Sequence, residues 1–320
     1  MSSGAHPASL LTPEVERKLA GLRFNIHYSM DGRLSGVHRS AQTGVSVEFS
    51  DHKEYSPGDD IRHLDWKAYA RSDRFYVRQF TKDTHANVHL LLDTSGSMDY
   101  ASHYSGLTKL AYSARLAAML AYMFLRQNDA VGLLTIRGGK LVKLLPARSH
   151  PSHLITIQQY LEEILAAPPA KDGSEGPTSM SEGLEYLVST RAMRHAVIVV
   201  SDFFLDMDSL FPYLGYLKSN GNFCWLVQVL DPAEFDQQKG HGRTFPFDGS
   251  MLLRSNETGH GILMDSKLAR ADYIARFQDF LKEMEDRSAE RGIELSRCNT
   301  DADPVEFIVR YLQESRGRGA

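Results

Sequence analysis

The chain has 320 residues, 42% of them hydrophobic and 24% charged, which is enough for one large α/β core or for a domain with an appendage. A net charge of -4 and a pI of about 6.4 argue against a nucleic-acid-binding surface. The sequence contains no apolar run of about 18 residues that could span a membrane, and its N-terminus does not read as a signal peptide. The two cysteines, Cys224 and Cys298, fit small buried residues in a reducing compartment. We therefore expect a cytoplasmic protein without a membrane span or a nucleic-acid partner.

The N-terminal part is expected to consist of a tail, a helix and a family-specific segment. Residues 1–12 are rich in Ser, Ala and Pro and are predicted to be a disordered tail. Thr12 and Pro13 form a helix start, and the helix is expected to run to about Leu22. Residues 13–86 are predicted to pack on the sheet of the following domain. Phe75–Phe80 alternates as a strand, and we expect it to pair antiparallel with Val88–Leu92.

The segment from Glu54 to Lys67 is dense in charged and aromatic residues and reads EYSPGDDIRHLDWK. It resembles bacterial family 58 of the domains of unknown function. In that family the motif Glu-Tyr-x-Pro-Gly-Asp-Asp-x-Arg-x-x-Asp-Trp-Lys precedes a von Willebrand A-like domain. The segment matches the motif without departure, and the resemblance extends over nearly the whole chain.

Two interpretations of this segment remain open. Its charges can form a salt-bridged network that fastens it to the sheet edge, with the aromatic residues in a satellite core. Alternatively, the segment is a partner-binding surface. The candidate contact residues are then Asp59, Asp60, Arg62 and Trp66.

The stretch Asn87–Tyr100, NVHLLLDTSGSMDY, reads as a buried strand that ends in a polar turn before a helix. Asp93, Ser95 and Ser97 would then lie at the carboxyl end of a strand, where open α/β sheets bind ligands. Carboxylate and hydroxyl oxygens are hard ligands that suit Mg²⁺, or else Mn²⁺ or Ca²⁺. The turn resembles the Asp-x-Ser-x-Ser turn of a metal-ion-dependent adhesion site in a von Willebrand A domain. The alternative is a polar turn that caps the next helix.

Two further loops are predicted to reach the same edge. The apolar run Ala196–Ser201 predicts a buried parallel strand that ends at Asp202. In a sheet of order 3-2-1-4-5-6 this strand neighbours the one that ends at Asp93, so both carboxylates flank the topological switch point. The family resemblance matches Thr178 to the threonine of the site's second loop, with a helix N-cap as the alternative. The expected metal ligands are Asp93, Ser95, Ser97, Thr178 and Asp202.

The fold class that follows is α/β, with a doubly wound and mostly parallel sheet of the von Willebrand A or Rossmann-like type over residues 87–314. An N-terminal extension precedes this domain, and a small β-hairpin excursion is expected within residues 232–265. Leu141–Leu145 is expected to be an antiparallel edge strand. Residues 315–320 are predicted to be a second disordered tail.

The resemblance implies protein binding and not catalysis. A divalent ion with an open coordination position would accept an Asp or Glu carboxylate from a protein partner, with Tyr100 and Phe203 as candidate apolar contacts. For Phe203 a place in the core is an equal alternative. Members of the family are commonly associated with MoxR-type AAA+ ATPases, which implies an adaptor of such a chaperone. The alternatives are a metal-dependent hydrolase or phosphatase that uses Asp93, and a structural scaffold with a vestigial site. Ser95 occupies the position at which a dehalogenase-type phosphatase has the aspartate that protonates the leaving group. The sequence also contains no Gly-x-Ser-x-Gly motif and no phosphate-binding loop.

Overall fold

The computed structural model describes residues 10–24, 26, 47–56, 64–72, 74–82, 85–167, 179–191, 194–235, 250–254 and 261–317. The chain divides into two compact units, which are described separately below. The larger comprises Met1–Leu34 and Ala86–Ala320, and the smaller is Ser35–His85.

The larger unit is built on a six-stranded sheet with the order β10-β7-β6-β3-β4-β5. Its strands are β3 (Asn87–Asp93), β4 (Ala130–Arg137), β5 (Lys140–Arg148), β6 (His195–Ser201), β7 (Phe223–Leu230) and β10 (Glu294–Asn299). All neighbours pair in parallel except β5, which is antiparallel to β4 at one edge. Counted along the chain this is the order 3-2-1-4-5-6. The predicted α/β fold class, the doubly wound sheet and the antiparallel edge strand are therefore confirmed.

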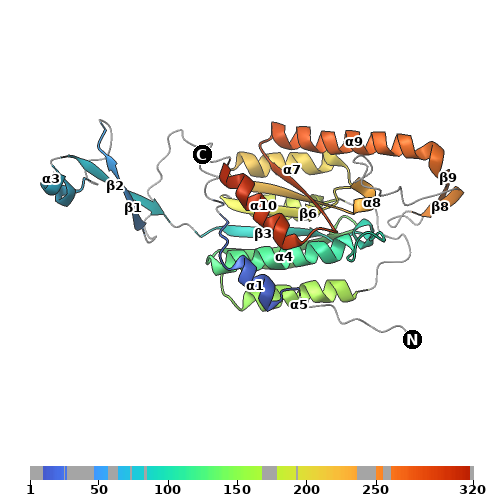
Figure 1. The fold of residues 1–320 in the computed structure, drawn as a ribbon, viewed down its shortest axis with the longest axis horizontal. Helices are drawn as coiled ribbons and strands as arrows, with labels where there is room; N and C mark the ends of the chain where they lie inside the picture. The colour runs from blue at the N-terminus through green and yellow to red at the C-terminus, as the bar shows by residue number, and fades with distance from the viewer. Residues whose placement is uncertain are drawn as a thin grey trace. The chain divides into compact units, whose positions relative to one another are not determined.

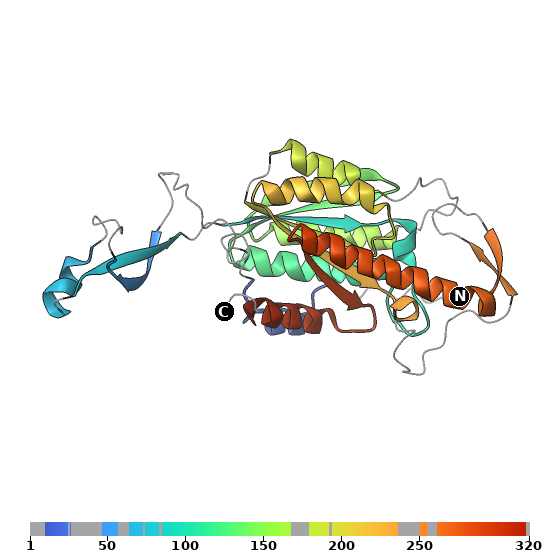
Figure 2. The ribbon, with the colours of Figure 1, turned by 90° about the horizontal axis from the view of Figure 1, so that it is seen from above.

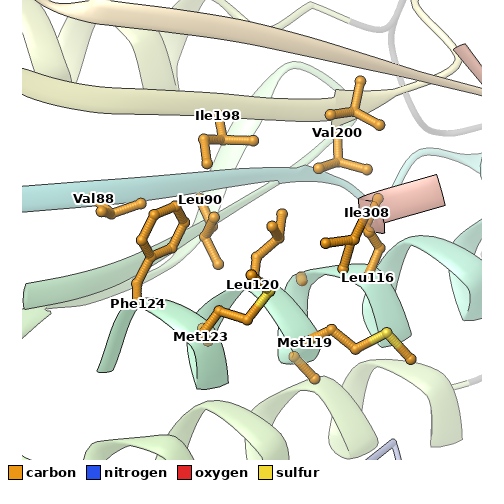
Figure 3. Close-up of a cluster of buried hydrophobic side chains, with 14 of the residues drawn as sticks. Val88, Leu90, Leu116, Met119, Leu120, Met123, Phe124, Ile198, Val200 and Ile308 are labelled. Carbon is orange, nitrogen blue, oxygen red and sulfur yellow. The ribbon is translucent and has the colours of Figure 1, made fainter. Parts of the chain in front are cut away.

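The central strands are apolar on both faces because helices cover both faces of the sheet. Val88, Leu90 and Leu92 of β3 pack into one buried cluster, whereas Leu91 packs into the other. Figure 3 shows the first cluster, in which Leu120 and Phe124 of helix α4 (Lys109–Arg126) meet side chains of β3 and β6. Since successive side chains of a strand point to opposite faces, an uninterrupted apolar run is what such a strand requires.

The helices form the outer two layers of this unit, as Figure 1 shows for α4 and α5 on one side and α7 and α9 on the other. The first layer contains α1 (Pro13–Leu19), α4 (Lys109–Arg126), α5 (His153–Ala166) and α10 (Pro304–Gly317). The second contains α6 (Ser181–Ser189), α7 (Met207–Ser219) and α9 (Ser266–Glu290). None of the described helices is both long and apolar enough to cross a membrane.

Both chain ends depart from the predicted disordered tails. Leu10 and Leu11 are only 3% and 5% exposed and belong to the core cluster, so the predicted tail 1–12 is wrong at its end. Burying two leucines offsets the entropy of ordering this part of the backbone. Helix α10 continues to Gly317, so residues 315–317 are helical where a tail was predicted.

A short antiparallel hairpin lies within the second half of the predicted excursion. Its strands are β8 (Ser250–Arg254) and β9 (Gly261–Asp265), and α9 begins directly after β9. Figures 1 and 2 place this hairpin at the end of the larger unit toward which β3 points. The β8–β9 hairpin is therefore an addition to the sheet and its covering helices, and it lies on the side of the sheet's carboxyl edge. The excursion begins with the short helix α8 (Pro232–Phe235).

The smaller unit contains a two-stranded antiparallel sheet and a helix. Strand β1 (Val47–Glu54) pairs with β2 (Tyr76–Lys82), and α3 (Trp66–Ser72) lies between them in sequence. The predicted pairing of residues 75–80 with Val88–Leu92 is wrong. Strand β3 pairs instead with the apolar strands β4 and β6, one on each of its two edges. Packing of this unit on the sheet stays a prediction.

A histidine pair lies within the sheet, away from its carboxyl edge. The rings of His89 on β3 and His195 on β6 stack, and Nε2 of His89 lies 3.0 Å from Nδ1 of His195. Burial, together with the charge of His195, lowers the pKa of His89 from 6.5 to about 4. Burial also lowers the pKa of His195. Both imidazoles are therefore neutral in the folded protein at neutral pH.

This pair predicts a loss of stability in mild acid. The unfolded His89 takes up a proton as the pH falls below 6.5, whereas the folded one stays neutral until about 4. Between pH 7 and pH 5 this difference lowers the free energy of unfolding by about 2 kcal/mol. Urea unfolding of wild type and His89→Leu at both pH values isolates this contribution, since other groups cancel in the difference. Exposed His150, changed to Leu, is the control, and a difference between wild type and His89→Leu that does not change with pH would contradict the prediction.

Candidate functional site

Asp93 ends β3 and is 0% exposed. Its Oδ1 accepts a hydrogen bond from the backbone N–H of Ser95 at 2.9 Å, and its Oδ2 accepts one from the Ser201 hydroxyl at 2.5 Å. The first bond closes the turn after β3, and the second joins the ends of two neighbouring strands. Among the described residues, no lysine or arginine forms an ion pair with Asp93.

The turn after Asp93 is fastened to the end of β4 and opens into the short 3-10 helix η2 (Gly96–Asp99). Both the backbone N–H and the hydroxyl of Thr94 donate to the carbonyl of Ile136, each at 2.8 Å. Ser95 occupies the N-cap position of η2 but makes no side-chain capping hydrogen bond. Its hydroxyl oxygen instead lies 3.1 Å from that of Ser97. This orientation weighs against helix capping as the role of Ser95.

Asp202 follows β6, the neighbour of β3, and is 1% exposed. The structure thus brings Asp93 and Asp202 to the two sides of the switch point, as the sheet order requires. The next residue, Phe203, has a φ of 59°, which is a left-handed conformation that is rare for a bulky residue. The sharp bend places the backbone N–H of Phe204 on Oδ1 of Asp202, at 3.1 Å. A strained backbone at this position is typical of a functional loop.

A buried lysine that the sequence analysis did not identify lies beside Asp202. Lys109 begins α4 and is 1% exposed. Its Nζ donates to Asp202 Oδ2 at 2.8 Å and to Glu234 Oε1 of α8 at 2.9 Å. The rings of Phe204 and Tyr100 lie 5.0 and 5.9 Å from the ammonium. The sequence signal was a lysine at the start of a helix rich in Leu, Ala and Met, a position that normally faces solvent.

The charges of this edge are unevenly compensated. Burial, and next the charge of Asp202, raises the pKa of Asp93 to about 7, although hydrogen bonds from Ser201 and Ser95 oppose the rise. Burial by itself would lower the pKa of Lys109, but the charges of Asp202 and Glu234 outweigh it and raise that pKa. Asp202 therefore has its counterion, whereas no described residue supplies one to Asp93. A cation bound at Asp93 would relieve the cost of its buried charge.

The donor set at Asp93 fits a small divalent ion. Among the described residues, no three His, Cys, Asp or Glu side chains group as metal ligands, so an ion here would depend on hydroxyl oxygens. An octahedral ion with ligands at about 2.0–2.1 Å places adjacent ligand oxygens roughly 2.9 Å apart. The hydroxyl oxygens of Ser95 and Ser97, 3.1 Å apart and next to Asp93, are compatible with that spacing.

Apart from Trp66, the remaining predicted site residues fall into three groups. Thr178 and the partner-binding candidates Asp59, Asp60 and Arg62 lie outside the described residues. Tyr100 is half-buried and borders the Lys109 ammonium, so it lies at the site. Of the two alternatives for Phe203, the partner contact is wrong and the core is right, because the residue is 0% exposed within a core cluster.

Trp66 in the smaller unit is 64% exposed, which predicts a small effect on stability. Its ring meets that of Tyr69 edge-on, and the Tyr69 ring stacks on Phe75 at 4.4 Å. Trp66→Ala should lower the free energy of unfolding by less than about 0.5 kcal/mol, as is usual for exposed sites. Tyr69→Ala is the comparison and should cost more. Equal losses in thermal or urea unfolding would instead favour the scaffold interpretation of Trp66.

Comparisons with known proteins bear on the family and the fold. The model of the family "Protein of unknown function DUF58" matches residues 51–282, well over half of the chain. The uncharacterized protein Rv1480 of Mycobacterium tuberculosis and the uncharacterized protein Mb1516 of Mycobacterium bovis are each 26% identical over 322 residues, covering 98% of this chain and 95% of the relative.

Among solved structures, the conserved hypothetical protein BatB of Bacteroides thetaiotaomicron has a TM-score of 0.43 at 18% identity, covering 73% of this chain and 99% of that one. The VWA domain of SpRpn10 has a TM-score of 0.39 at 10% identity, covering 71% and 95%. Likeness at this level carries no argument about function. The family match confirms the resemblance of the Glu54–Lys67 segment, and the chain belongs to the DUF58 family of proteins of unknown function.

Proposed function

We propose that this protein is a metal-dependent protein-interaction module. A divalent ion, Mg²⁺ before Mn²⁺ or Ca²⁺, is held by Asp93, Ser95 and Ser97 at the carboxyl edge of the sheet. Thr178 supplies the second loop and Asp202 the third. The bound ion offers one open position to an Asp or Glu carboxylate of a protein partner.

The observation that carries this proposal is the surroundings of Asp93. Its carboxylate is fully buried without an ion-pair partner among the described residues, and the hydroxyl oxygens of Ser95 and Ser97, in the turn directly after it, lie 3.1 Å apart. Such a carboxylate is costly in a protein interior unless a cation reaches it. Oxygen ligands that include few charged groups leave a divalent ion electrophilic, which favours an anionic ligand at the open position.

The partner follows from the family resemblance and not from the geometry. We propose a MoxR-type AAA+ ATPase with an exposed acidic residue, for which this chain is an adaptor in the cytoplasm. The half-buried ring of Tyr100 borders the Lys109 ammonium beside Asp202 and is a candidate for the rim of such a contact. The exposed ring of Trp66 in the smaller unit is a candidate for a second contact.

A hydrolase that uses Asp93 is the second candidate, and the surroundings of Asp93 disfavour it. Position 95 is a serine whose hydroxyl pairs with Ser97, so no carboxylic acid stands there to protonate a leaving group. With Mg²⁺, the purified protein should hydrolyse phosphate esters, carboxyl esters and ATP no faster than Asp93→Asn does. Turnover that is lost in Asp93→Asn would move the protein to the hydrolase class.

The proposal is tested by capturing partners from native lysate with the full chain as bait, in Mg²⁺ and in EDTA. Wild type should retain a partner only in Mg²⁺, and Asp93→Asn should retain none in either buffer. Asp208→Asn is the matched control, because it removes a carboxylate that is 78% exposed and paired with Arg287. Retention of the same partner by wild type in EDTA and by Asp93→Asn would overturn the metal-dependent mechanism.

A further inference from the structure

The Lys109 ammonium is a buried cation inside the carboxyl-edge site. It lies 2.8 Å from Asp202 and 2.9 Å from Glu234, with the side chains of Lys109 and Asp202 each 1% exposed. We propose that Lys109 is a resident cation that sets the divalent-ion affinity of this site and holds Asp202 out of direct coordination. This inference rests on the proposed function and assigns a positioning residue to the same site.

The bonds of Asp202 show why it is held. Its Oδ2 accepts from the Lys109 ammonium and its Oδ1 accepts from the backbone N–H of Phe204. Both oxygens are thus oriented by donors, one on α4 and one in the loop after β6, whereas the donors that the described residues supply to Asp93 are neutral. Asp93 would therefore be the carboxylate available to hold an ion directly, and Asp202, whose two oxygens are already bonded, would act on the ion through water. An ion held in this way would keep more of its positive charge for an incoming carboxylate.

Lys109 also fixes the charge of the cluster. Asp93, Asp202 and Glu234 contribute three negative charges when ionised, and the ammonium compensates one of them. Repulsion between a buried ammonium and an incoming divalent ion weakens the affinity for that ion, since screening by water is poor in a buried site. A site tuned in this way binds the ion weakly without its partner and more tightly once a partner carboxylate adds its charge.

The cage around the ammonium is more extensive than an ion pair alone requires. Glu234 is itself positioned, because its Oε2 accepts from the backbone N–H of Asp231 at 2.9 Å. The rings of Phe204 and Tyr100 border the ammonium as well. Lys109 thus joins the loops that follow β3, β6 and β7 at one point. A displacement of Tyr100 or Phe204 by a partner would be transmitted to Asp202 through this point.

Two single variants on the same ion pair separate a tuning role from a structural one. Lys109→Met removes the positive charge, and Glu234→Gln removes a negative charge while its amide oxygen can still accept from Lys109. If the pair only supports the fold, both variants loosen the same contact and shift ion affinity in the same direction. If Lys109 tunes the site electrostatically, the two shifts have opposite signs.

The measurement is a calorimetric titration of the purified full chain with MgCl₂ at pH 8. Lys109→Met should bind Mg²⁺ on the order of tenfold more tightly than wild type, and Glu234→Gln should bind it severalfold more weakly. Equal or weaker binding by Lys109→Met, with binding by wild type intact, would overturn the inference and leave the proposed function standing. If Lys109→Met does not fold, Glu234→Gln decides, and unchanged or tighter binding by it counts against the inference.

The two proposals fail in distinguishable ways. If wild type binds no Mg²⁺ while Lys109→Met does, Lys109 holds the position of the ion, and only the metal-dependent function is wrong. If neither protein binds Mg²⁺, the tuning role of Lys109 and the metal-dependent function are both overturned.

Discussion

Asp93→Asn is expected to abolish the thermal stabilisation that Mg²⁺ gives the wild type. An ion that binds only the folded state stabilises it by about 2.7 kcal/mol at a concentration one hundred times its Kd. For a domain of this size that corresponds to a rise in Tm of roughly 5–10 °C. Asparagine keeps the shape of the side chain but removes the charge that the ion neutralises. In EDTA at pH 8 the variant should be at least as stable as wild type, because the repulsion between Asp93 and Asp202 is gone.

Differential scanning calorimetry of both proteins with Mg²⁺ and with EDTA measures this effect. Asp208→Asn should retain the full Mg²⁺-dependent rise, because its carboxylate is exposed and belongs to α7. A rise of the same size in wild type and Asp93→Asn would show that the ion stabilises the protein somewhere else.

Lys109→Met should destabilise the protein by about 3–5 kcal/mol in EDTA, because it leaves buried carboxylates without their counterion. Asp202 is 1% exposed and Glu234 is 15% exposed, so water cannot take over the role of the ammonium. Against a typical total of about 5–15 kcal/mol, a loss of this size moves the unfolding midpoint far outside experimental error.

Urea unfolding in EDTA at pH 8 is the appropriate measurement. The matched control is Lys140→Met, which removes an exposed lysine at the start of β5 and should change stability by less than about 0.5 kcal/mol. Unfolding of Lys109→Met at the urea concentration of wild type would show that the ion pair has no net effect on stability.

The fold was largely predictable because the strands carry strong local signals. The apolar runs at 88–92 and 196–201 fit strands buried on both faces, and the expected order of the sheet placed Asp93 beside Asp202. The partner of the strand at 76–82 was not predictable, since an alternating pattern does not specify which strand it pairs with. Strand β1 carries charged residues at Glu48, Asp51 and Lys53, so its sequence lacks the apolar pattern that predicts a strand. Its pairing with β2 was therefore not predicted.

The candidate site was predictable at the positions that end strands and not at those that depend on packing. Asp93, Ser95, Ser97 and Asp202 follow apolar runs directly, so their place at the sheet edge follows from the strands. Lys109 was missed because burial of a lysine depends on two carboxylates from loops 93 and 125 residues further along the chain. The sequence left Phe203 open between a partner contact and the core, because no sequence pattern indicates the left-handed backbone that turns its ring into the core.

The central claim is that Asp93, Ser95 and Ser97 hold one divalent ion, and Mn²⁺ binding followed by electron paramagnetic resonance tests it most directly. Wild type should bind a single Mn²⁺ per chain that excess Mg²⁺ displaces. The paired variant Ser95→Ala/Ser97→Ala should lose this site while it unfolds at nearly the wild-type temperature in EDTA, because neither hydroxyl caps a helix or bonds the backbone in the described structure. Mn²⁺ binding of the same stoichiometry and affinity in both proteins would contradict the site and the function proposed from it.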